Sequence, residues 1–436
     1  MTTDQLVNYR ETYEPLTEDP LTLMARLARG GLYDQYAVYE NGPEWSYAGG
    51  VLATFRLGRE ICRAEGARDL SAVDEWLAAL PMTRWRVYGW AAFELGAALA
   101  GARPSDVHGG EDLLYLVVPA VEVRVKGDRV LLRATEPGEL DRLVGLVRDR
   151  GESGDPESTE RVSVPLEDGG GYREAVACAL NDLRGPGPLT KVILSRRVAV
   201  PVPLDLTATY VAGRRANTPA RSFLLELGGI GAAGFSPETV AEVTADRRVV
   251  SRPLAGTRAR SGAPDEDARL RADLLSDPKE IHEHAISVRL ALEDLALVCD
   301  DTRTTEYMTV AERGTVQHLA STVVGHLRAD RTPWQAFAAL FPAVTATGIP
   351  KTPAYDLIRT LEEQPRGLYA GAVLTYDSSG ALDAALVLRS VFQQDGHCWL
   401  QAGAGIVPQS RPPREHEETC EKLRSVAGHL VPAQDR

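Results

Sequence analysis

The chain is poor in cysteine and in positive charge. Its 436 residues include five scattered cysteines, with no CxxC pair and no zinc-site spacing: Cys62, Cys178, Cys299, Cys398 and Cys420. An odd, dispersed set of this kind argues against a disulfide scaffold and favours reduced thiols in a cytosolic protein. The formal net charge of −13 disfavours nucleic acid or an anionic membrane as a partner, because such partners select a basic surface.

Long apolar runs and phosphate-binding loops are also missing. No apolar run approaches the roughly 20 residues that a membrane helix needs. The polar, acidic N-terminus MTTDQLVNYRETYEPL lacks the apolar core of a signal peptide. We therefore expect a cytoplasmic protein. Neither G-x-x-x-x-G-K-[ST] nor G-x-G-x-x-G after a strand occurs, so the usual loops that bind nucleotide phosphates are absent.

The N-terminal part of the chain contains a series of patterns that predict strands. Residues 36–57 predict a hairpin around Asn41-Gly42, residues 85–99 a strand leading into a helix, and residues 114–135 two strands around Gly127-Asp128. Residues 148–162 are polar and rich in glycine and serine, which is typical of a linker. The first 160 residues thus form a β-rich part of the chain.

Helix and strand patterns alternate in the rest of the chain. Helices are expected at 171–185, 276–298 and 413–430, and strands at 191–202, 221–243 (a pair), 315–327, 369–377, 383–393 and 398–402. Asp277 suits the N-cap of the long helix and Pro278 its first turn. Its expected buried stripe is Ile281, Ala285, Val288 and Leu292. Hairpin-rich strands with helices between them predict an α+β fold with antiparallel sheets rather than a doubly wound parallel sheet.

Two of these helices carry an E-x-x-E pair close to the N-terminus. Glu280 and Glu283 lie on the first, and Glu415 and Glu418 on the last, four residues before Lys422. Spacings of three and four residues put these side chains on one helix face. Each pair alone is most simply a solvated complement to the helix dipole. Four converging carboxylates would instead require a cation between them, and oxygen-only ligands suit magnesium.

A glycine pair precedes the second acidic pair. We interpret Gly403-Ala404-Gly405 as a turn that offers bare backbone N–H groups to a carboxylate. Because the phosphate-binding loops are missing, the expected ligand is a small carboxylic acid bridged to magnesium.

Three polar residues in apolar surroundings leave two interpretations open: Lys191, Glu238 and His318. A lysine on a strand is usually a solvated edge residue, a glutamate after Ser-Pro usually starts a helix, and a lone histidine is usually a hydrogen-bonded core residue. A functional pocket would instead lower the pKa of the lysine, making it a base, and raise that of the glutamate, making it an acid. One base and one acid on opposite faces of a ring would suit addition of water with loss of a hydroxyl.

Nine segments in this order between residues 191 and 423 resemble a known family. They are KVILSRRVAV, GFSPETV, RPLAGTRAR, KEIHEHAISVR, VQHLASTVVGHL, FPAVTATGIPK, RGLYAGAV, ALVLRSVF and AGAGIVPQSRPPREHEETCEKL. The set resembles the chorismate-utilising enzymes, which are the anthranilate, aminodeoxychorismate, isochorismate and salicylate synthases. It is most similar to the salicylate synthases of siderophore pathways.

The resemblance implies a single large α+β fold of the anthranilate synthase component I type, with antiparallel sheets wrapped by helices around a magnesium-dependent pocket. Residues 1–160 would be its N-terminal β-rich part and residues 165–432 its chorismate-binding catalytic core. Lys191 matches the general base that activates water at C2 of chorismate, and Glu238 the general acid that protonates the departing C4 hydroxyl. The implied magnesium ligands are Glu283 and Glu418 directly, and Glu280 and Glu415 through water.

The remaining implied pocket residues surround the substrate. They are Tyr369 and Arg389, with the backbone of Gly403 and Gly405, at the pyruvyl carboxylate; Gly256 and Thr257 beside the ring; and His318 and Lys422 near the ring carboxylate and the metal. The sequence departs from the pattern at two places. Arg252 stands where an acidic residue is familiar, and Thr347 where a serine is familiar.

Lys191 also separates the branches of the family. Ammonia-using members generally have glutamine there, so a lysine implies water as the nucleophile. Thr345 resembles the salicylate synthases more than enzymes that stop at isochorismate. The expected activity is therefore a magnesium-dependent salicylate synthase, and the alternative is an isochorismate synthase. A non-catalytic chorismate-binding regulator and an anthranilate-type subunit are the further alternatives. We expect a monomer with no glutaminase subunit.

Overall fold

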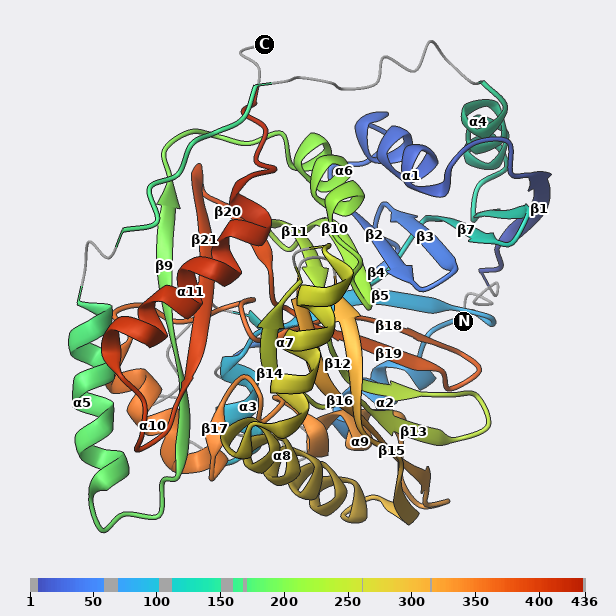
Figure 1. The fold of residues 1–436 in the computed structure, drawn as a ribbon. Coiled ribbons are helices and arrows are strands. Elements are labelled where there is room, and N and C mark those ends of the chain that lie inside the picture. Colours follow the sequence, from blue (N-terminus) through green and yellow to red (C-terminus); the bar gives the residue numbers. More distant parts are fainter. Residues whose placement is uncertain are drawn as a thin grey trace.

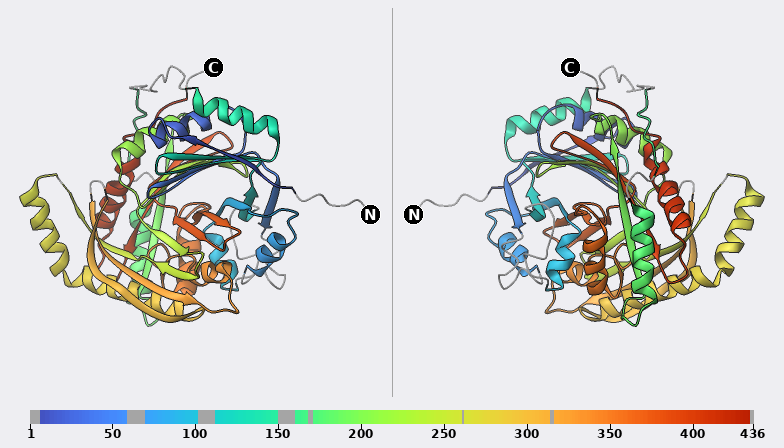
Figure 2. Two further views of the ribbon diagram at one scale, coloured as in Figure 1. Left: turned by 90° about the vertical axis from the view of Figure 1, so that its right-hand side faces the viewer. Right: turned by 90° about the vertical axis from the view of Figure 1, so that its left-hand side faces the viewer.

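Two large antiparallel sheets share one core (Figures 1 and 2). The computed structural model describes residues 7–58, 70–101, 112–149, 160–167, 171–260, 262–313 and 316–433. Most of the predicted linker, and Cys62, lie outside these residues; the other four cysteines are free thiols. No helix in the described ranges is both long and apolar enough to span a membrane.

The first sheet has 11 strands and combines both parts of the chain. In spatial order its strands are β1 (Arg10–Pro15), β8 (Arg129–Ala134), β7 (Val121–Lys126), β3 (Glu44–Gly49), β2 (Tyr36–Asn41), β10 (Arg221–Leu227), β11 (Ile230–Ser236), β20 (Ser390–Gln394), β21 (His397–Ile406), β9 (Lys191–Val200) and β17 (Gly348–Ile349). The register pairs Ile193 of β9 with Gly405 of β21.

The second sheet has 10 strands. In spatial order it contains β14 (Leu254–Ala259), β16 (Val316–Leu327), β13 (Arg248–Ser251), β12 (Thr239–Val243), β19 (Leu382–Leu386), β18 (Ala372–Asp377), β5 (Arg86–Ala91), β6 (Asp112–Val118) and β4 (Ala53–Gly58), while β15 (Cys299–Arg313) branches from this order and pairs with β16.

Alternating apolar side chains explain why the first sheet is covered on both faces. On β10, Phe223 and Leu225 point into the core shared with the second sheet, whereas Leu224 points to the opposite face. Successive residues of a strand point to opposite faces, so both sets must be buried. Burial of apolar area at about 25 cal/mol per Å² is the main force that holds such layers together.

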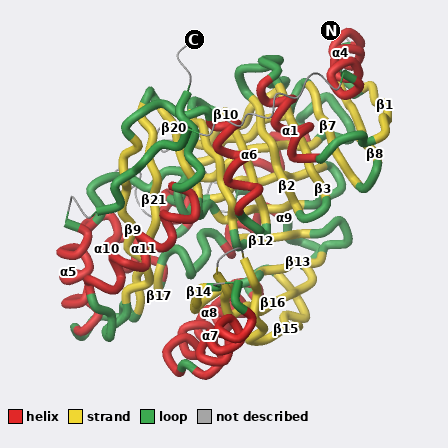
Figure 3. Tube along the Cα trace, turned by 45° about the horizontal axis from the view of Figure 1, so that its top comes forward, coloured by secondary structure: helices red, strands yellow, loops and turns green. Residues whose placement is uncertain are grey.

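Helices cover the outer face of the first sheet and the sides of the second. Over the first sheet lie α1 (Pro20–Arg29), α4 (Pro137–Arg148), α6 (Leu206–Ala216) and α11 (Pro412–Ala427). Packed against the shared core are α2 (Ser71–Ala78), α3 (Glu94–Leu99), α5 (Tyr172–Arg184), α8 (Pro278–Ala296), α9 (Pro333–Leu340) and α10 (Lys351–Leu361). Figure 3 shows α8 beside α7 (Pro264–Ser276) at one end of the molecule. The predicted α+β class is therefore confirmed.

Several predicted strands divide between the two sheets. The segment 45–57 is β3 in one sheet and β4 in the other, 114–135 contains β6, β7 and β8, 221–243 adds β12, and 383–393 is β19 followed by β20. Gly50 has φ +70° and Arg389 has φ +51°, so the chain bends sharply at two of these crossings. A hydrophobicity pattern continues across such a bend because both halves are buried, which hides the break.

Helix α8 confirms its predicted cap but not its predicted face. The Asp277 side chain accepts hydrogen bonds from two backbone N–H groups of the first turn, and Pro278 follows it. The buried residues are His284, Ser287, Val288, Ala291 and Leu295. Only Val288 belongs to the predicted stripe; Ile281, Ala285 and Leu292 are half-buried. The first two residues of the buried face, His284 and Ser287, are polar, so a search for apolar residues at helical spacing does not find them. The prediction also missed helices α1, α2, α4, α6, α7, α9 and α10 and strands β1, β13, β14, β15 and β17.

Candidate active site

One cavity of about 860 Å³ collects every site residue that the sequence predicts. Its lining includes Lys191, Glu238, Gly256, Thr257, Glu280, Glu283, His318, Thr345, Tyr369, Arg389, Gly403, Gly405, Glu415, Glu418 and Lys422. The lining residues lie on β9 and β21 of the first sheet, on β14 and β16 of the second, and on helices α8 and α11. Figure 1 labels these elements. Residues as far apart in the sequence as 191 and 422 therefore meet in one place.

Lys191 is the first residue of β9 and is only 8% exposed. Its Nζ donates a hydrogen bond to Glu283 Oε2 at 3.0 Å. The interpretation as a solvated edge residue is therefore wrong, because the side chain points into the cavity and pairs with helix α8.

The glycines of the Gly-Ala-Gly segment make room for side chains and do not form the predicted turn. They lie inside β21, paired with β9. A Cβ on Gly405 would stand 3.0 Å from Cε of Lys191, and one on Gly403 would stand 2.7 Å from the carbonyl oxygen of Leu194 and 3.1 Å from the Tyr369 hydroxyl. A larger residue at either position would displace its neighbour. Because glycine has no side chain, the cavity stays open beside Lys191 and Tyr369.

Glu238 lies where the chain crosses from the first sheet to the second, between β11 and β12, and is 5% exposed. Its Oε1 accepts hydrogen bonds from Thr345 Oγ1 at 3.0 Å and from the Leu254 backbone N–H at 3.3 Å. Burial raises its pKa to about 8, against the opposing effects of these bonds and of Lys191. Glu238 is thus a protonated acid at neutral pH, and its environment is a strand crossing rather than a helix start.

His318 of β16 is held as a neutral ring. Its Nδ1 lies 3.0 Å from Thr257 Oγ1 and 3.2 Å from the carbonyl oxygen of Gly256, and its Nε2 lies 3.4 Å from Nη2 of Arg389. Burial and the Arg389 charge lower its pKa to about 3. Since Arg389 can only donate, these partners assign the proton to Nδ1 and leave Nε2 as an acceptor.

Arg389 and Tyr369 both line the cavity. Burial lowers the pKa of Arg389 to about 10, so its guanidinium remains charged at neutral pH. Burial raises the pKa of Tyr369 well above its ordinary value, so this hydroxyl remains a neutral donor. The two groups together offer hydrogen-bond donors that suit a carboxylate.

The four carboxylates lie on α8 and α11 among cations of the protein. Arg258 Nη1 donates to Glu280 at 3.1 Å, and Lys422 Nζ donates to Glu418 at 2.8 Å and to the carbonyl oxygen of Gly403 at 2.8 Å. Burial and repulsion within each pair raise the pKa of Glu280 and of Glu415. Burial opposes ionisation of Glu418 too, but Lys422 outweighs it and the pKa of Glu418 is lowered.

Lys279 tests whether these carboxylates could share a divalent ion. Within the described residues, no three His, Cys, Asp or Glu side chains are already gathered closely enough to hold a metal. The Lys279 ammonium nevertheless lies 3.7 Å from Glu283 Oε1; burial acts to lower its pKa, but the four carboxylates outweigh this and raise it. Glu283 Oε1 is buried and receives no hydrogen bond from the residues that the structure describes. The negative charge of all four carboxylates thus acts on the single cationic group of Lys279. Carboxylate oxygens are the ligands that a hard cation such as magnesium prefers, so these four side chains fit such an ion.

Sequence reasoning found Lys191, Arg389 and Lys422 but missed other cations that line the cavity, among them Lys279 and Arg258. Lys279 stands four residues before Glu283, a spacing that signals a helical ion pair. Arg258 follows Thr257 directly and joins Asp273, Asp277 and Glu280; nothing in the local sequence indicates these partners.

The two departures from the family pattern lie away from the cavity wall. Arg252 does not line the cavity and pairs with Glu242 at 2.5 Å. Thr347 is buried and donates to the carbonyl oxygen of Ala343, 3.1 Å away. Neither residue forms a hydrogen bond or an ion pair with Lys191 or Glu238.

Comparison with known proteins places this geometry in a family. Residues 35–428 match the chorismate binding enzyme family. The chain is 42% identical over 438 residues to the salicylate synthase of Mycolicibacterium paratuberculosis, covering 96% of each chain. It is 34% identical over 466 residues to anthranilate synthase component 1 of Thermus thermophilus, again covering 96% of each.

Solved structures share the fold at low sequence identity. The menaquinone-specific isochorismate synthase MenF from Escherichia coli matches with a TM-score of 0.74 and 20% identity, covering 97% of this chain and 94% of that one. The anthranilate synthase component I from Streptococcus pneumoniae TIGR4 matches with a TM-score of 0.71 and 22% identity, covering 95% and 92%. Together with the match along residues 35–428, these findings identify the chain as a member of the chorismate binding enzyme family.

Proposed function

We propose that the protein is a magnesium-dependent salicylate synthase, which converts chorismate through isochorismate to salicylate and pyruvate. The observation that carries this proposal is the placement of Lys191 and Glu238 on one cavity with the carboxylates of α8 and α11. The 42% identity to a salicylate synthase along 96% of both chains supports it.

The first reaction adds water at C2 of chorismate and removes the C4 hydroxyl. In the proposal, Nζ of Lys191 takes a proton from the attacking water, and Glu238 gives a proton to the departing hydroxyl, which leaves as water. The raised pKa of Glu238, about 8, keeps this proton in place at neutral pH. The hydrogen bonds from Thr345 and Leu254 both reach Oε1, so Oε2 is the oxygen that delivers the proton.

The substrate is a dicarboxylate, and the cavity offers donors for both groups. We assign the enolpyruvyl carboxylate to Arg389 and Tyr369, which border the cavity together with Gly403. We assign the ring carboxylate to the part of the cavity near Lys422 and the acidic pairs. Glu283 and Glu418 would hold magnesium directly, with Glu280 and Glu415 supporting it through water. When bound, this ion supplies the positive charge that attracts the ring carboxylate and offsets the four glutamates.

The second reaction releases pyruvate from isochorismate. It can proceed by transfer of hydrogen from C2 to the enolpyruvyl side chain within one molecule, so it needs a compact conformer rather than another acid or base. Thr345 is suited to shape this conformer, because it borders the cavity directly beside Glu238.

Incubation of the purified protein with chorismate and magnesium tests the proposal. The expected result is equimolar salicylate and pyruvate, followed by salicylate fluorescence and a lactate dehydrogenase assay and identified by mass spectrometry. Accumulation of isochorismate alone would replace the proposal with the alternative, an isochorismate synthase. Anthranilate formed with ammonium salts, or no consumption of chorismate, would reject it.

The proposal also covers the setting of the reaction. We propose a cytoplasmic monomer that needs no glutaminase subunit and whose salicylate feeds a siderophore or another salicylate-derived metabolite. Size-exclusion chromatography with light scattering checks the oligomeric state, and full activity of the isolated chain with water as nucleophile checks the independence from a partner.

A further inference from the structure

Arg366 lies behind the catalytic cavity and is 1% exposed. It follows helix α10 in the chain and does not line the cavity that holds Lys191. Its Nη2 donates to the carbonyl oxygen of Ile193 at 2.6 Å, and its Nη1 donates to the carbonyl oxygen of Ala346 at 2.8 Å. One rigid, planar guanidinium therefore joins strand β9 to the segment that precedes β17.

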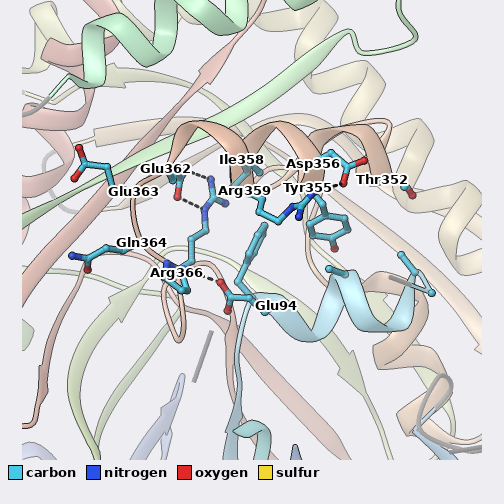
Figure 4. Close-up of a pocket in the computed structure, with 15 residues that line it drawn as sticks. Glu94, Thr352, Tyr355, Asp356, Ile358, Arg359, Glu362, Glu363, Gln364 and Arg366 are labelled. Atoms are coloured by element: carbon cyan, nitrogen blue, oxygen red, sulfur yellow. Dashed lines mark hydrogen bonds and ion pairs between the residues drawn. The ribbon is translucent and has the colours of Figure 1, made fainter. Parts of the chain in front are cut away.

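Glu362 completes this arrangement from the end of α10. Its two oxygens accept from Nε and Nη2 of Arg366 at 3.0 and 2.6 Å (Figure 4). The same two oxygens accept from the backbone N–H of Ser195 at 2.7 Å and from its hydroxyl at 2.9 Å. Strand β9 is thus held at Ile193 by the guanidinium and at Ser195 by the carboxylate.

Both anchored segments carry or contact a candidate catalytic group. Lys191 begins β9, two residues before Ile193. Ala346 follows Thr345, whose hydroxyl donates to Glu238. The same guanidinium is therefore bonded to the segment of the proposed base and to the segment that contacts the proposed acid.

We propose that Arg366, braced by Glu362, is a positioning residue that sets the separation of Lys191 and Glu238 across the cavity. This inference rests on the proposed function. It assigns no contact with substrate to Arg366: the guanidinium acts through the backbone at Ile193 and Ala346. Because the first reaction needs base and acid on opposite faces of the ring at once, it depends on this separation. The second reaction, within a single molecule of isochorismate, depends on it less.

A second cavity, separate from the catalytic one, is lined in part by this pair. It has a volume of about 480 Å³, lies between α3 and α10, and is lined by Arg366, Glu362 and Glu94 together with residues of both helices (Figure 4). None of its lining residues borders the catalytic cavity. A small cation can therefore reach the place of the guanidinium without competing with chorismate.

Chemical rescue provides the test. Arg366→Ala should lower kcat for chorismate about 100-fold, the cost of misplacing reacting groups by about 1 Å, with little change in KM. Guanidinium chloride, far below denaturing concentrations, should restore kcat at least about tenfold, whereas sodium chloride at the same ionic strength should not. Added isochorismate should still give salicylate, with a loss at least about tenfold smaller than that for chorismate.

Two further variants keep the test decisive where Arg366→Ala fails to fold. Glu362→Gln keeps the size of the side chain but removes the charge that braces Arg366, and it should lower kcat for chorismate about tenfold. Glu363→Gln is the matched control, because Glu363 is exposed and lines the same second cavity; it should leave both reactions unchanged.

The outcomes separate this inference from the proposed function. Wild-type protein that forms no salicylate rejects the proposed function itself. If the wild-type protein is active, two results for Glu362→Gln overturn the inference. One is a kcat equal to that of the wild type, and the other is an equal loss of rate in both reactions. A folded Arg366→Ala protein that guanidinium does not rescue also overturns it.

Discussion

Nζ of Lys191 lies 3.0 Å from Oε2 of Glu283 and so ties the start of β9 to helix α8. The other oxygen of Glu283 faces Lys279 at 3.7 Å. One glutamate therefore contacts the candidate base and also belongs to the proposed metal site. A shift of α8 along β9 would disturb both at once.

Replacement of Lys191 by alanine should abolish water addition and leave the fold intact. Loss of a general base costs about 10²–10⁴-fold in rate, and Glu283 keeps Lys279 as a neighbouring cation. Chorismate consumption and circular dichroism measure the two effects. The matched control is Lys351→Ala, which breaks another lysine contact to α8, the 2.9 Å pair with Asp294, and should leave the rate unchanged. Normal turnover by Lys191→Ala would refute the base assignment.

The activity on chorismate should fall as the pH rises through about 8. Burial raises the pKa of Glu238 to about 8, and only the protonated carboxyl can give a proton to the leaving hydroxyl. The pH profile of kcat/KM reports this group in the free enzyme. Glu238→Gln, which carries no titrating proton, should stall the loss of the C4 hydroxyl at every pH.

Thr345→Val provides the control for this pH profile. The Thr345 hydroxyl donates to Glu238 Oε1 and opposes the rise of its pKa by burial, so removing it should raise the pKa further and move the alkaline limb to higher pH. An unmoved limb in Thr345→Val would show that another group controls the decline.

Magnesium should stabilise the wild-type protein against heat, and Glu418→Gln should weaken this effect. A bound divalent ion would relieve the repulsion that contributes to the raised pKa of Glu280 and Glu415, and ligand binding to the folded state raises the melting temperature. Differential scanning fluorimetry with magnesium or EDTA measures the shift without requiring activity. Glu417→Gln is the control, because Glu417 is exposed and pairs with Arg424. Equal shifts in both variants would count against the site.

Glu94→Gln should change how stability depends on pH. Burial raises the pKa of Glu94 from 4.5 to about 7, so the folded protein retains a proton that the unfolded chain releases. The wild-type free energy of unfolding should then contain a contribution that is complete below pH 4.5 and is lost as the pH rises to about 7. This contribution to the free energy of unfolding is at most about 3 kcal/mol, because each unit of difference in pKa corresponds to roughly 1.36 kcal/mol.

Urea unfolding of both proteins at pH 5 and pH 8 isolates this contribution, because every other titrating group is common to the two. The wild type should lose more stability than Glu94→Gln between these conditions. Parallel losses would show that Glu94 does not carry the shift.

Part of the secondary structure and the types of the site residues were accessible from local pattern, as the Asp277 cap and the two E-x-x-E pairs demonstrate. The strand crossings were not. Glu238 and Arg389 stand at two of them, and a buried segment on either side of a bend has the same hydrophobicity as a straight strand. Gly403 and Gly405 were correctly predicted to border the site, but they were predicted to form a turn and instead lie in a strand. The need for glycine comes from Lys191, Leu194 and Tyr369, which approach them from other parts of the chain.

The sequence by itself determined the α+β class, the helices that carry the acidic pairs and the residue types of the site, because these follow from side-chain chemistry and from periods of two and 3.6 residues along the chain. Only the tertiary structure decided that Lys191 meets Glu283, that Glu238 is buried enough to keep its proton, and that Arg366 holds β9. Those properties depend on distance and burial between segments far apart in the chain, and such quantities exist only once the two sheets have packed together.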